Sequence, residues 1–432
     1  MVGTFRQRRV VSALLLGAFA LGLAACGTVY PNSTFSHNTD FNTSIDALWD
    51  TLLAWGTGVF VVVELVLVYT IFRFRRRPDG KTPVQILGNT KVEIAWTVIP
   101  AVILLIIAIP TVRAIFETQA RAVPNALQVQ VIGHQWWWEF RYPEYGITTA
   151  NELYLPTGRT ANFELKTNDV LHAFWIPQMG GKRDLISNRS NFLWFTPNAD
   201  LPSSAWNGYC GEYCGASHAN MKLRLYTVKP DEFAKWVAHQ QQSAVFPVAP
   251  PAPLAVPAPA AADRVKVQPV AAKAADSLAA VPARVQVPVW TFPRERLDAE
   301  FAATNPSTPV PPGLAFDERL LANGSAERGR QIYSRSMCIG CHVIKGNPSS
   351  MGIIGPNLTH IATRHTIAGG LYPNDAKHMA LWIKNAPHLK PGSLMPTIGK
   401  GLFDPVRKNT ITMGGLTDAE IADIVAYLQA LK

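Results

Sequence analysis

Two long apolar stretches on either side of a basic loop constrain this chain most. They span 52–72 and 92–115, and each supplies the ~20 residues with which a helix crosses a bilayer. The charged residues between them are all basic except Asp79: Arg73, Arg75, Arg76, Arg77, Lys81 and Lys91. Because basic loops stay on the cytoplasmic side, we predict a transmembrane hairpin over 49–115 whose two flanks lie outside.

The N-terminal segment has the pattern of an export signal. Arg6, Arg8 and Arg9 precede an apolar run that is too short to span a bilayer comfortably, and this run ends in Leu-Ala-Ala before Cys26. We therefore predict a signal peptide over 1–25 and an extracytoplasmic segment over 26–48. The last residues resemble a bacterial lipoprotein processing site, which predicts a lipid on Cys26. A plain signal peptide with an incidental cysteine is the alternative.

Three further segments differ in composition. Short alternating apolar runs between Gly, Pro and Asn over 116–240 are typical of the strands of a sandwich or barrel. Residues 241–316 are rich in Ala, Val and Pro, with fourteen prolines; we expect an extended linker without a packed core. Residues 317–432 predict helices over 326–334, 377–385 and 418–431, with a capping box at the start of the last. The predicted fold is multidomain: a membrane hairpin, an all-β domain and an all-α domain.

Charge is uneven along the chain. The net charge is +10, and the last segment holds 13 basic and 8 acidic residues, against 11 of each over 116–240. The β segment shows no stripe of arginines and aromatics. We therefore expect no nucleic-acid partner.

One cluster of soft donors lies near the end of the β segment. Its side-chain donors are two cysteines, two histidines and a methionine: His172, Cys210, Cys214, His218 and Met221. Glu212 lies between the two cysteines. Thiolate, imidazole and thioether favour copper over magnesium or calcium. With a nearby carbonyl there are more donors than one tetrahedral zinc accepts, so a pair of coppers fits better. A disulfide between the cysteines is the alternative.

A second constellation lies in the all-α segment. Cys338-Ile-Gly-Cys341-His342 is the pattern for covalent attachment of a c-type haem. Two thioether bonds would hold the macrocycle while His342 binds the iron. A sixth ligand has to come from elsewhere in the chain.

The copper cluster and the hairpin before it closely resemble the copper-A subunit of cytochrome c oxidase, subunit II, over roughly residues 45–238. The resemblance implies a cupredoxin-like β domain. It also implies that His172, Cys210, Cys214, His218 and Met221 are side-chain ligands to dinuclear copper. Glu212 would ligate copper through its backbone carbonyl, and its carboxylate would bind magnesium at the boundary with subunit I.

Two further motifs match the same family. Gly133-His134-Gln135-Trp136-Trp137-Trp138 resembles its aromatic motif, in which the position of Trp136 is an exposed point where electrons enter. Adjacent residues on a strand alternate between faces, so we expect at least one of these tryptophans to be exposed; packing filler is the alternative. Glu93 matches the mouth of a proton path into subunit I, and a solvated flank is its alternative.

The haem segment resembles class I cytochromes c. Pro391-Gly-Ser-Leu-Met395-Pro396 resembles their distal loop, which implies that Met395 is the sixth ligand. Three other methionines are rivals without the flanking prolines: Met351, Met379 and Met413. The resemblance also implies that the carbonyl of Pro356 orients His342 and that Arg364 contacts a haem propionate. Trp382 packs on a propionate or fills the core.

Together these resemblances imply subunit II of a caa3-type cytochrome c oxidase. Electrons from cytochrome c or a quinol–cytochrome c reductase would pass through haem c and copper-A to haem in subunit I, with subunit III as a further partner. Oxygen reduction and proton pumping would belong to the partner chains of this respiratory enzyme. The implied location is the bacterial plasma membrane, with both redox domains on the periplasmic side. The copper-A subunit of a nitric oxide reductase is the alternative.

Overall fold

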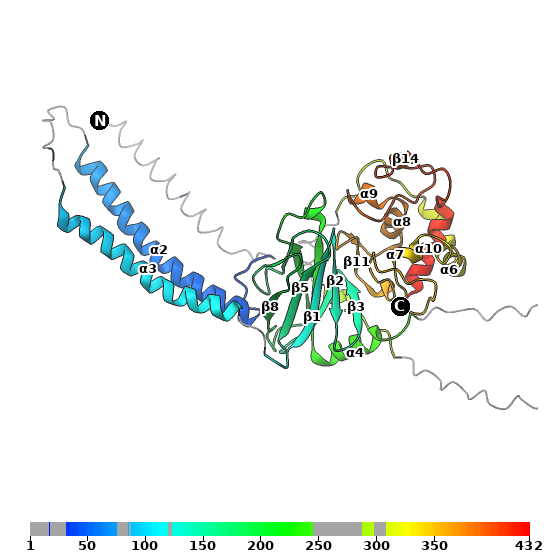
Figure 1. Cartoon of the computed structure of the whole chain (residues 1–432), viewed down its shortest axis with the longest axis horizontal. Coiled ribbons are helices and arrows are strands. Elements are labelled where there is room, and N and C mark those ends of the chain that lie inside the picture. Colours follow the sequence, from blue (N-terminus) through cyan, green and yellow to red (C-terminus); the bar gives the residue numbers. More distant parts are fainter. Residues whose placement is uncertain are drawn as a thin grey trace, which may run out of the picture.

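The computed structural model describes residues 32–75, 88–119, 123–244, 287–297 and 308–432, with Gly17 and Gln85. The predicted lipidation site, Cys26, and the predicted signal peptide apart from Gly17 lie outside the described residues. The described part forms a helical hairpin, a β domain and a mostly helical domain in a row (Figure 1). The predicted fold class is confirmed.

The hairpin consists of α2 (Asp40–Arg73) and α3 (Thr90–Gln119). The two helices lie side by side (Figure 1), and both are long and apolar enough to cross a membrane, with mean hydropathies of 2.1 and 2.5 over an 18-residue apolar stretch of each. Helix α2 begins well before the apolar stretch, because Thr39 caps it by accepting a hydrogen bond from Asn42 N. The extra turns carry the helix out of the apolar layer to the β domain.

The start of α2 is part of the β domain's packing. Thr39 Oγ1 donates to Met179 O at 2.6 Å, and Asn42 Nδ2 donates to Pro177 O at 3.2 Å. Phe41 between them is buried in the β-domain core. These contacts fix the β domain directly at the outer end of the hairpin.

The β domain is a sandwich of two five-stranded sheets, with strand orders β3-β2-β1-β5-β8 and β4-β10-β9-β6-β7. Its elements are β1 (Leu127–His134), β2 (Trp137–Tyr142), β3 (Ile147–Ala150), β4 (Glu152–Pro156), β5 (Ala161–Thr167), β6 (His172–Trp175), β7 (Arg183–Leu185), β8 (Asn191–Phe195), β9 (Ser204–Cys210), β10 (Lys222–Val228) and the final helix α4 (Pro230–Gln240). Leu127, Val129 and Val131 of β1 point inward while Gln128 is exposed, as the period of two requires.

The C-terminal domain packs helices around a separate apolar core. Its elements are η3 (Glu318–Asn323), α6 (Ala326–Tyr333), α7 (Cys338–Cys341), η4 (Ile361–Thr363), β11 (Thr366–Ile367), β12 (Tyr372–Pro373), α8 (Ala376–Lys384), α9 (Ala386–Leu389), β13 (Phe403–Asp404), β14 (Asn409–Thr410) and α10 (Asp418–Ala430). The three predicted helices are present within about a turn of their predicted bounds. Thr417 and Glu420 form the predicted capping box of α10.

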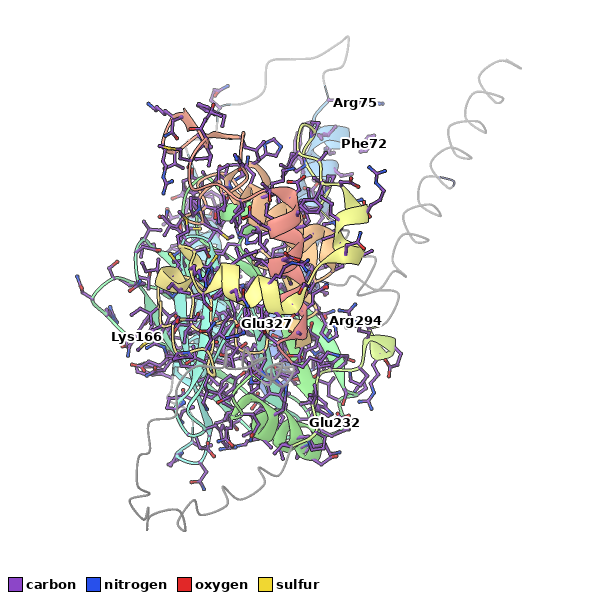
Figure 2. The ribbon with its side chains drawn as sticks, turned by 90° about the vertical axis from the view of Figure 1, so that its right-hand side faces the viewer. Phe72, Arg75, Lys166, Glu232, Arg294 and Glu327 are labelled. Atoms are coloured by element: carbon purple, nitrogen blue, oxygen red, sulfur yellow. The ribbon has the colours of Figure 1, made fainter. Side chains whose placement is uncertain are left out.

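One part of the predicted linker is packed, which corrects the expectation that no core forms over 241–316. Residues 287–297, with η2 (Arg294–Arg296), lie along the β domain beside α4 (Figure 2). Phe292 is fully buried in the β-domain core, where its ring lies 5.0 Å from that of Tyr226. Trp290 and Phe292 supply apolar area that the surrounding Pro and Ala residues do not. Burying a Phe side chain contributes roughly 1.5–3 kcal/mol to stability.

Candidate metal centre and haem cavity

The soft donors converge at one end of the sandwich. His172 begins β6, Cys210 ends β9, and the loop from β9 to β10 carries the remaining donors. Cys210 Sγ lies 3.8 Å from His172 Nδ1 and 3.7 Å from Cys214 Sγ. Cys214 Sγ in turn lies 3.6 Å from His218 Nδ1 and 3.9 Å from Met221 Sδ. All five donor atoms therefore surround one small volume.

Burial and charge suit this volume to a metal. His172, Cys210, Cys214 and Met221 are buried and His218 is half-buried. The contact with Cys214 lowers the pKa of the Cys210 thiol, and the same contact raises the pKa of Cys214. A bound metal ion would take both cysteines as thiolates. Both cysteines are free thiols, and their separation far exceeds the ~2.05 Å of a disulfide, so the disulfide alternative is wrong for this structure.

Each donor is held by a further contact. His172 Nε2 bonds Asp169 Oδ1 at 2.8 Å, which leaves Nδ1 toward the sulfurs. Burial opposes protonation of His172, yet the hydrogen bond to Asp169 leaves its pKa raised. The carbonyl of Glu212 lies 3.2 Å from Cys210 Sγ, beside the donors, while its side chain is exposed.

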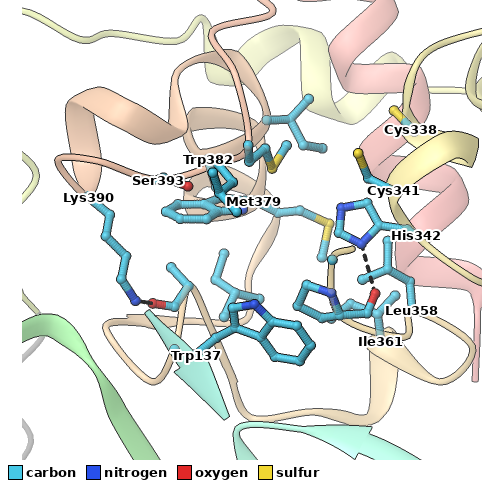
Figure 3. Close-up of a pocket in the computed structure, with 18 of the residues that line it drawn as sticks. Trp137, Cys338, Cys341, His342, Leu358, Ile361, Met379, Trp382, Lys390 and Ser393 are labelled. Atoms are coloured by element: carbon cyan, nitrogen blue, oxygen red, sulfur yellow. Dashed lines mark hydrogen bonds between the residues drawn. The ribbon is translucent and has the colours of Figure 1, made fainter. Parts of the chain in front are cut away.

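The haem-attachment residues line a cavity in the C-terminal domain (Figure 3). Cys338, Cys341 and His342 form one wall, and apolar side chains form most of the rest. His342 Nδ1 donates to Pro356 O at 2.8 Å, which leaves Nε2 free to bind iron. Gly355 packs on the imidazole so closely that a Cβ there would lie 2.6 Å from its Cε1. Two thiols, an oriented imidazole and an apolar wall fit a c-type haem.

The remaining haem residues of the prediction line the same cavity. Met395 is half-buried there, but Met379 also lines the cavity, whereas Met351 and Met413 are exposed and do not. Arg364 is buried in the wall, where burial lowers its pKa to about 10. This buried guanidinium suits a propionate as its counter-ion. Trp382 also lines the cavity (Figure 3).

The three adjacent tryptophans are not exposed, which corrects the sequence-based expectation. Trp138 is fully buried, Trp136 is 7% exposed and Trp137 is half-buried. Trp136 lies in the turn between β1 and β2 rather than on a strand, and the C-terminal domain covers this edge of the sandwich, so that Trp136 and Trp137 line the haem cavity. A direct approach of an external protein to Trp136 is therefore closed in this arrangement.

Sequence analysis missed the residues that join the two domains. Glu152 is 2% exposed and accepts hydrogen bonds from His365 N at 2.7 Å and Thr366 N at 2.9 Å of the C-terminal domain. Lys390 is 3% exposed and reaches across to the carbonyl of Trp136. No local pattern marks these residues, because their partners lie more than 200 positions away in the chain.

Glu93 lies in the first turn of α3 and is exposed in this single chain. Its Oε1 accepts a hydrogen bond from Asn89 N at 3.1 Å. The carboxylate thus accepts a hydrogen bond from a backbone N–H at the start of the helix. This structural role is compatible both with a proton-path mouth and with a solvated flank.

Comparisons with known proteins agree with this architecture. The family profile "Cytochrome C oxidase subunit II, transmembrane domain" matches residues 37–114, the profile of its periplasmic domain matches 146–228, and "Cytochrome c" matches 326–432. The cytochrome c oxidase subunit 2 of Bacillus sp. PS3 is 29% identical over 97% of this chain and 96% of its own length. That of Alkalihalophilus pseudofirmus is 28% identical over 87% and 83%, and that of Synechocystis is 33% identical over 45% and 71%.

The fold and the two sites define a membrane-anchored electron-transfer subunit with a copper domain and a c-type cytochrome domain. The chain belongs to the cytochrome c oxidase subunit II family. Its fused cytochrome c domain is the arrangement of a caa3-type oxidase, and the two soluble domains imply copper-A and haem c. From here on, residues 123–244 with 287–297 are called the copper domain and residues 308–432 the haem domain.

Proposed function

We propose that this subunit of a caa3-type oxidase passes electrons from an external donor through haem c to copper-A and on to subunit I. The observation that carries this proposal is the convergence of five donors, each within 3.9 Å of a cysteine sulfur: His172, Cys210, Cys214, His218 and Met221. When bound, copper-A and haem c each accept and release single electrons. The relatives that cover nearly the whole chain are oxidase subunits, so the nitric oxide reductase alternative is not favoured.

In this proposal the protein orients the ligands and excludes water. Asp169 holds the imidazole of His172, and the carbonyl of Glu212 lies beside the sulfurs. In the haem domain, Pro356 orients His342, which together with Met395 would hold the haem iron, and Arg364 would pair with a propionate. A thioether ligand raises the potential and closes the iron to oxygen, which suits a carrier.

The remaining assignments belong to the same proposal. The carboxylate of Glu212 contributes to a magnesium site shared with subunit I, and Glu93 lies at the mouth of a proton path. Cys26 carries a lipid after signal cleavage. The complex lies in the bacterial plasma membrane with subunits I and III, and takes electrons from cytochrome c or a quinol–cytochrome c reductase.

Electron paramagnetic resonance of the purified complex tests the proposal. We expect a multiline signal from one unpaired electron shared by two coppers, because Cys210 and Cys214 would supply two thiolates to the same pair of ions. Cys214→Ser should abolish that signal while the haem absorption persists. A single-copper spectrum, or a multiline signal that survives Cys214→Ser, would contradict the proposed ligand set.

A further inference from the structure

The contact between the two domains centres on Trp136 of the copper domain. Its indole Nε1 donates to Cys214 O at 3.0 Å, and Gln135 Nε2 donates to the same carbonyl at 2.7 Å. On its other side the indole meets the haem-domain loop 390–396, which carries Met395. A continuous path of contacts thus runs from this loop through one indole to a residue of the copper cluster.

Gly392 makes the contact with the indole possible. Its φ is +84°, and a Cβ there would lie 2.4 Å from Trp136 Cη2 and 2.6 Å from Cζ3. Any side chain would therefore push the loop off the ring as well as strain the backbone. Ser217 Oγ donates to Pro391 O at 2.6 Å and fixes the loop from the copper-domain side.

Lys390 fixes the same loop from the other side. Its Nζ donates to Trp136 O at 2.5 Å and to Ala368 O at 2.9 Å, so one ammonium group ties together both domains. Burial lowers the pKa of Lys390 to about 7, which shows that the contact is held against a desolvation cost. An apolar residue would fill this place without that cost, so packing alone does not account for a lysine.

We propose that Lys390 and Gly392 are positioning residues for electron transfer between the haem and copper domains. Lys390 clamps the backbone of Trp136, and Gly392 lets the loop that carries Met395 lie against the indole. Neither residue is itself a predicted iron or copper ligand; each acts through Trp136. This inference rests on the proposed function, because it requires a redox centre on each side of the contact.

A pair of glycine variants of the complete oxidase tests the part played by Gly392. Gly401 also has a φ of +84° but has open space where a Cβ would lie, so Gly401→Ala carries the same backbone strain without the indole contact. Flash-induced electron transfer from haem c to copper should slow by about tenfold or more in Gly392→Ala, since ~1 Å of displacement at reacting partners is costly. It should be unchanged in Gly401→Ala. Equal rates in the two variants would overturn the proposal.

The clamp is tested by exposure of the indole rather than by turnover. Lys390→Met keeps the length and apolar stem of the side chain, and exposed Lys400→Met is its control. Hydroxyl-radical footprinting of the full chain should show several-fold more oxidation of Trp136 in Lys390→Met and no change in Lys400→Met. An unchanged footprint in Lys390→Met would refute the clamp.

Further readouts separate this inference from the proposed function. The haem potential and the copper resonance signal are measured in every variant. Slower transfer at an unchanged potential supports a positioning role, whereas slowing that is fully explained by a shifted potential overturns it. Absence of the copper signal from the parent complex would contradict the proposed function, while the footprint of Trp136 would still decide whether Lys390 holds the contact.

Discussion

At the scale of single residues, two of the three predicted metal-binding imidazoles have one nitrogen engaged by a partner and one left for the metal. His172 is tied through Nε2 to Asp169, and His342 is tied through Nδ1 to Pro356. The free nitrogen is Nδ1 in His172 and Nε2 in His342, because Asp169 binds Nε2 of the first ring and the Pro356 carbonyl binds Nδ1 of the second. Such contacts fix ring orientation and tautomer and raise ligand basicity.

Replacing Asp169 should therefore weaken copper binding without removing a ligand. Asp169→Asn keeps the shape of the side chain but loses the charge that holds His172, and we expect copper affinity to fall about 10-fold to 100-fold. Titration against a competing chelator measures this change. Asp184→Asn, on the exposed part of β7, is the control and should bind copper normally.

Met395 and Met379, which both line the haem cavity, can be told apart in the same way. Met395→Leu should lower the haem potential and change the visible absorption of the oxidised form, because the thioether ligand is lost. Met379→Leu should change neither, since it swaps buried side chains of similar volume. The opposite pattern would show that Met379 is the ligand and that the flanking prolines misled the assignment.

At the scale of elements, the segment 287–297 and helix α4 form the flank of the copper domain beside the haem domain. Thr291 Oγ1 donates to Thr363 O of η4 at 2.7 Å, and Arg296 pairs with Glu232 of α4. Figure 2 shows Arg294 of this segment and Glu232 along this flank. The segment between the two domains is therefore attached to the copper domain at residues 287–297. The haem domain follows this attachment point more closely in sequence than it follows α4.

The anchor depends on Phe292, so Phe292→Ala should release it. Truncation of a buried Phe costs about 3 kcal/mol or more, which corresponds to ~100-fold more frequent opening. Trypsin should then cleave after Arg294 and Arg296 correspondingly faster. Val289→Ala removes an exposed side chain of the same segment, and should leave the cleavage rate unchanged. Equal rates in the two variants would show that the burial of Phe292 does not hold the segment.

Acid should weaken the contact between the domains. His239 of α4 lies with its ring 4.5 Å from that of His360 in the haem domain, and burial, together with His360, lowers the pKa of His239 to about 4. Between pH 4 and the ordinary value of 6.5, the undocked state binds more protons than the docked state. Docking therefore strengthens as pH rises through this window and is lost as pH falls.

Footprinting of Trp136 across this pH range measures the docking directly. Oxidation of the indole should increase from pH 6.5 to pH 4 in the parent oxidase and should increase less in His239→Gln, which cannot titrate. An identical pH profile in His239→Gln would show that His239 does not cause the acid sensitivity.

At the scale of the whole molecule, local sequence patterns predicted the elements and the metal site but did not predict the contacts between domains. Hydrophobic length gave the hairpin, alternation gave strands such as β1 and β10, and a capping box gave the start of α10. The copper donors lie together because four of the five fall within twelve residues around one strand-to-strand loop, and His172 begins a strand paired with β9. These features depend on residues close in sequence or in one sheet.

The interface could not be predicted in the same way. Three features depend on surfaces brought together by folding. They are the burial of Trp136, the hydrogen bonds that Glu152 accepts from the haem domain, and the packing of Phe292 in the copper-domain core. Composition predicted a linker rich in Pro and Ala over 241–316, but two aromatic residues within it, Trp290 and Phe292, were enough to pack part of it. Exposure inferred from an isolated domain changes when a second domain covers it.

The central claim is that electrons cross from haem c to copper-A within one docked subunit. The most direct measurement is flash reduction of haem c in the assembled oxidase, followed at the absorption of both centres. Haem oxidation and copper reduction should share one first-order rate that is independent of protein concentration and nearly independent of ionic strength, because the contact is intramolecular and its charged groups are buried from screening. A rate that rises with protein concentration, or falls steeply with added salt, would contradict the account.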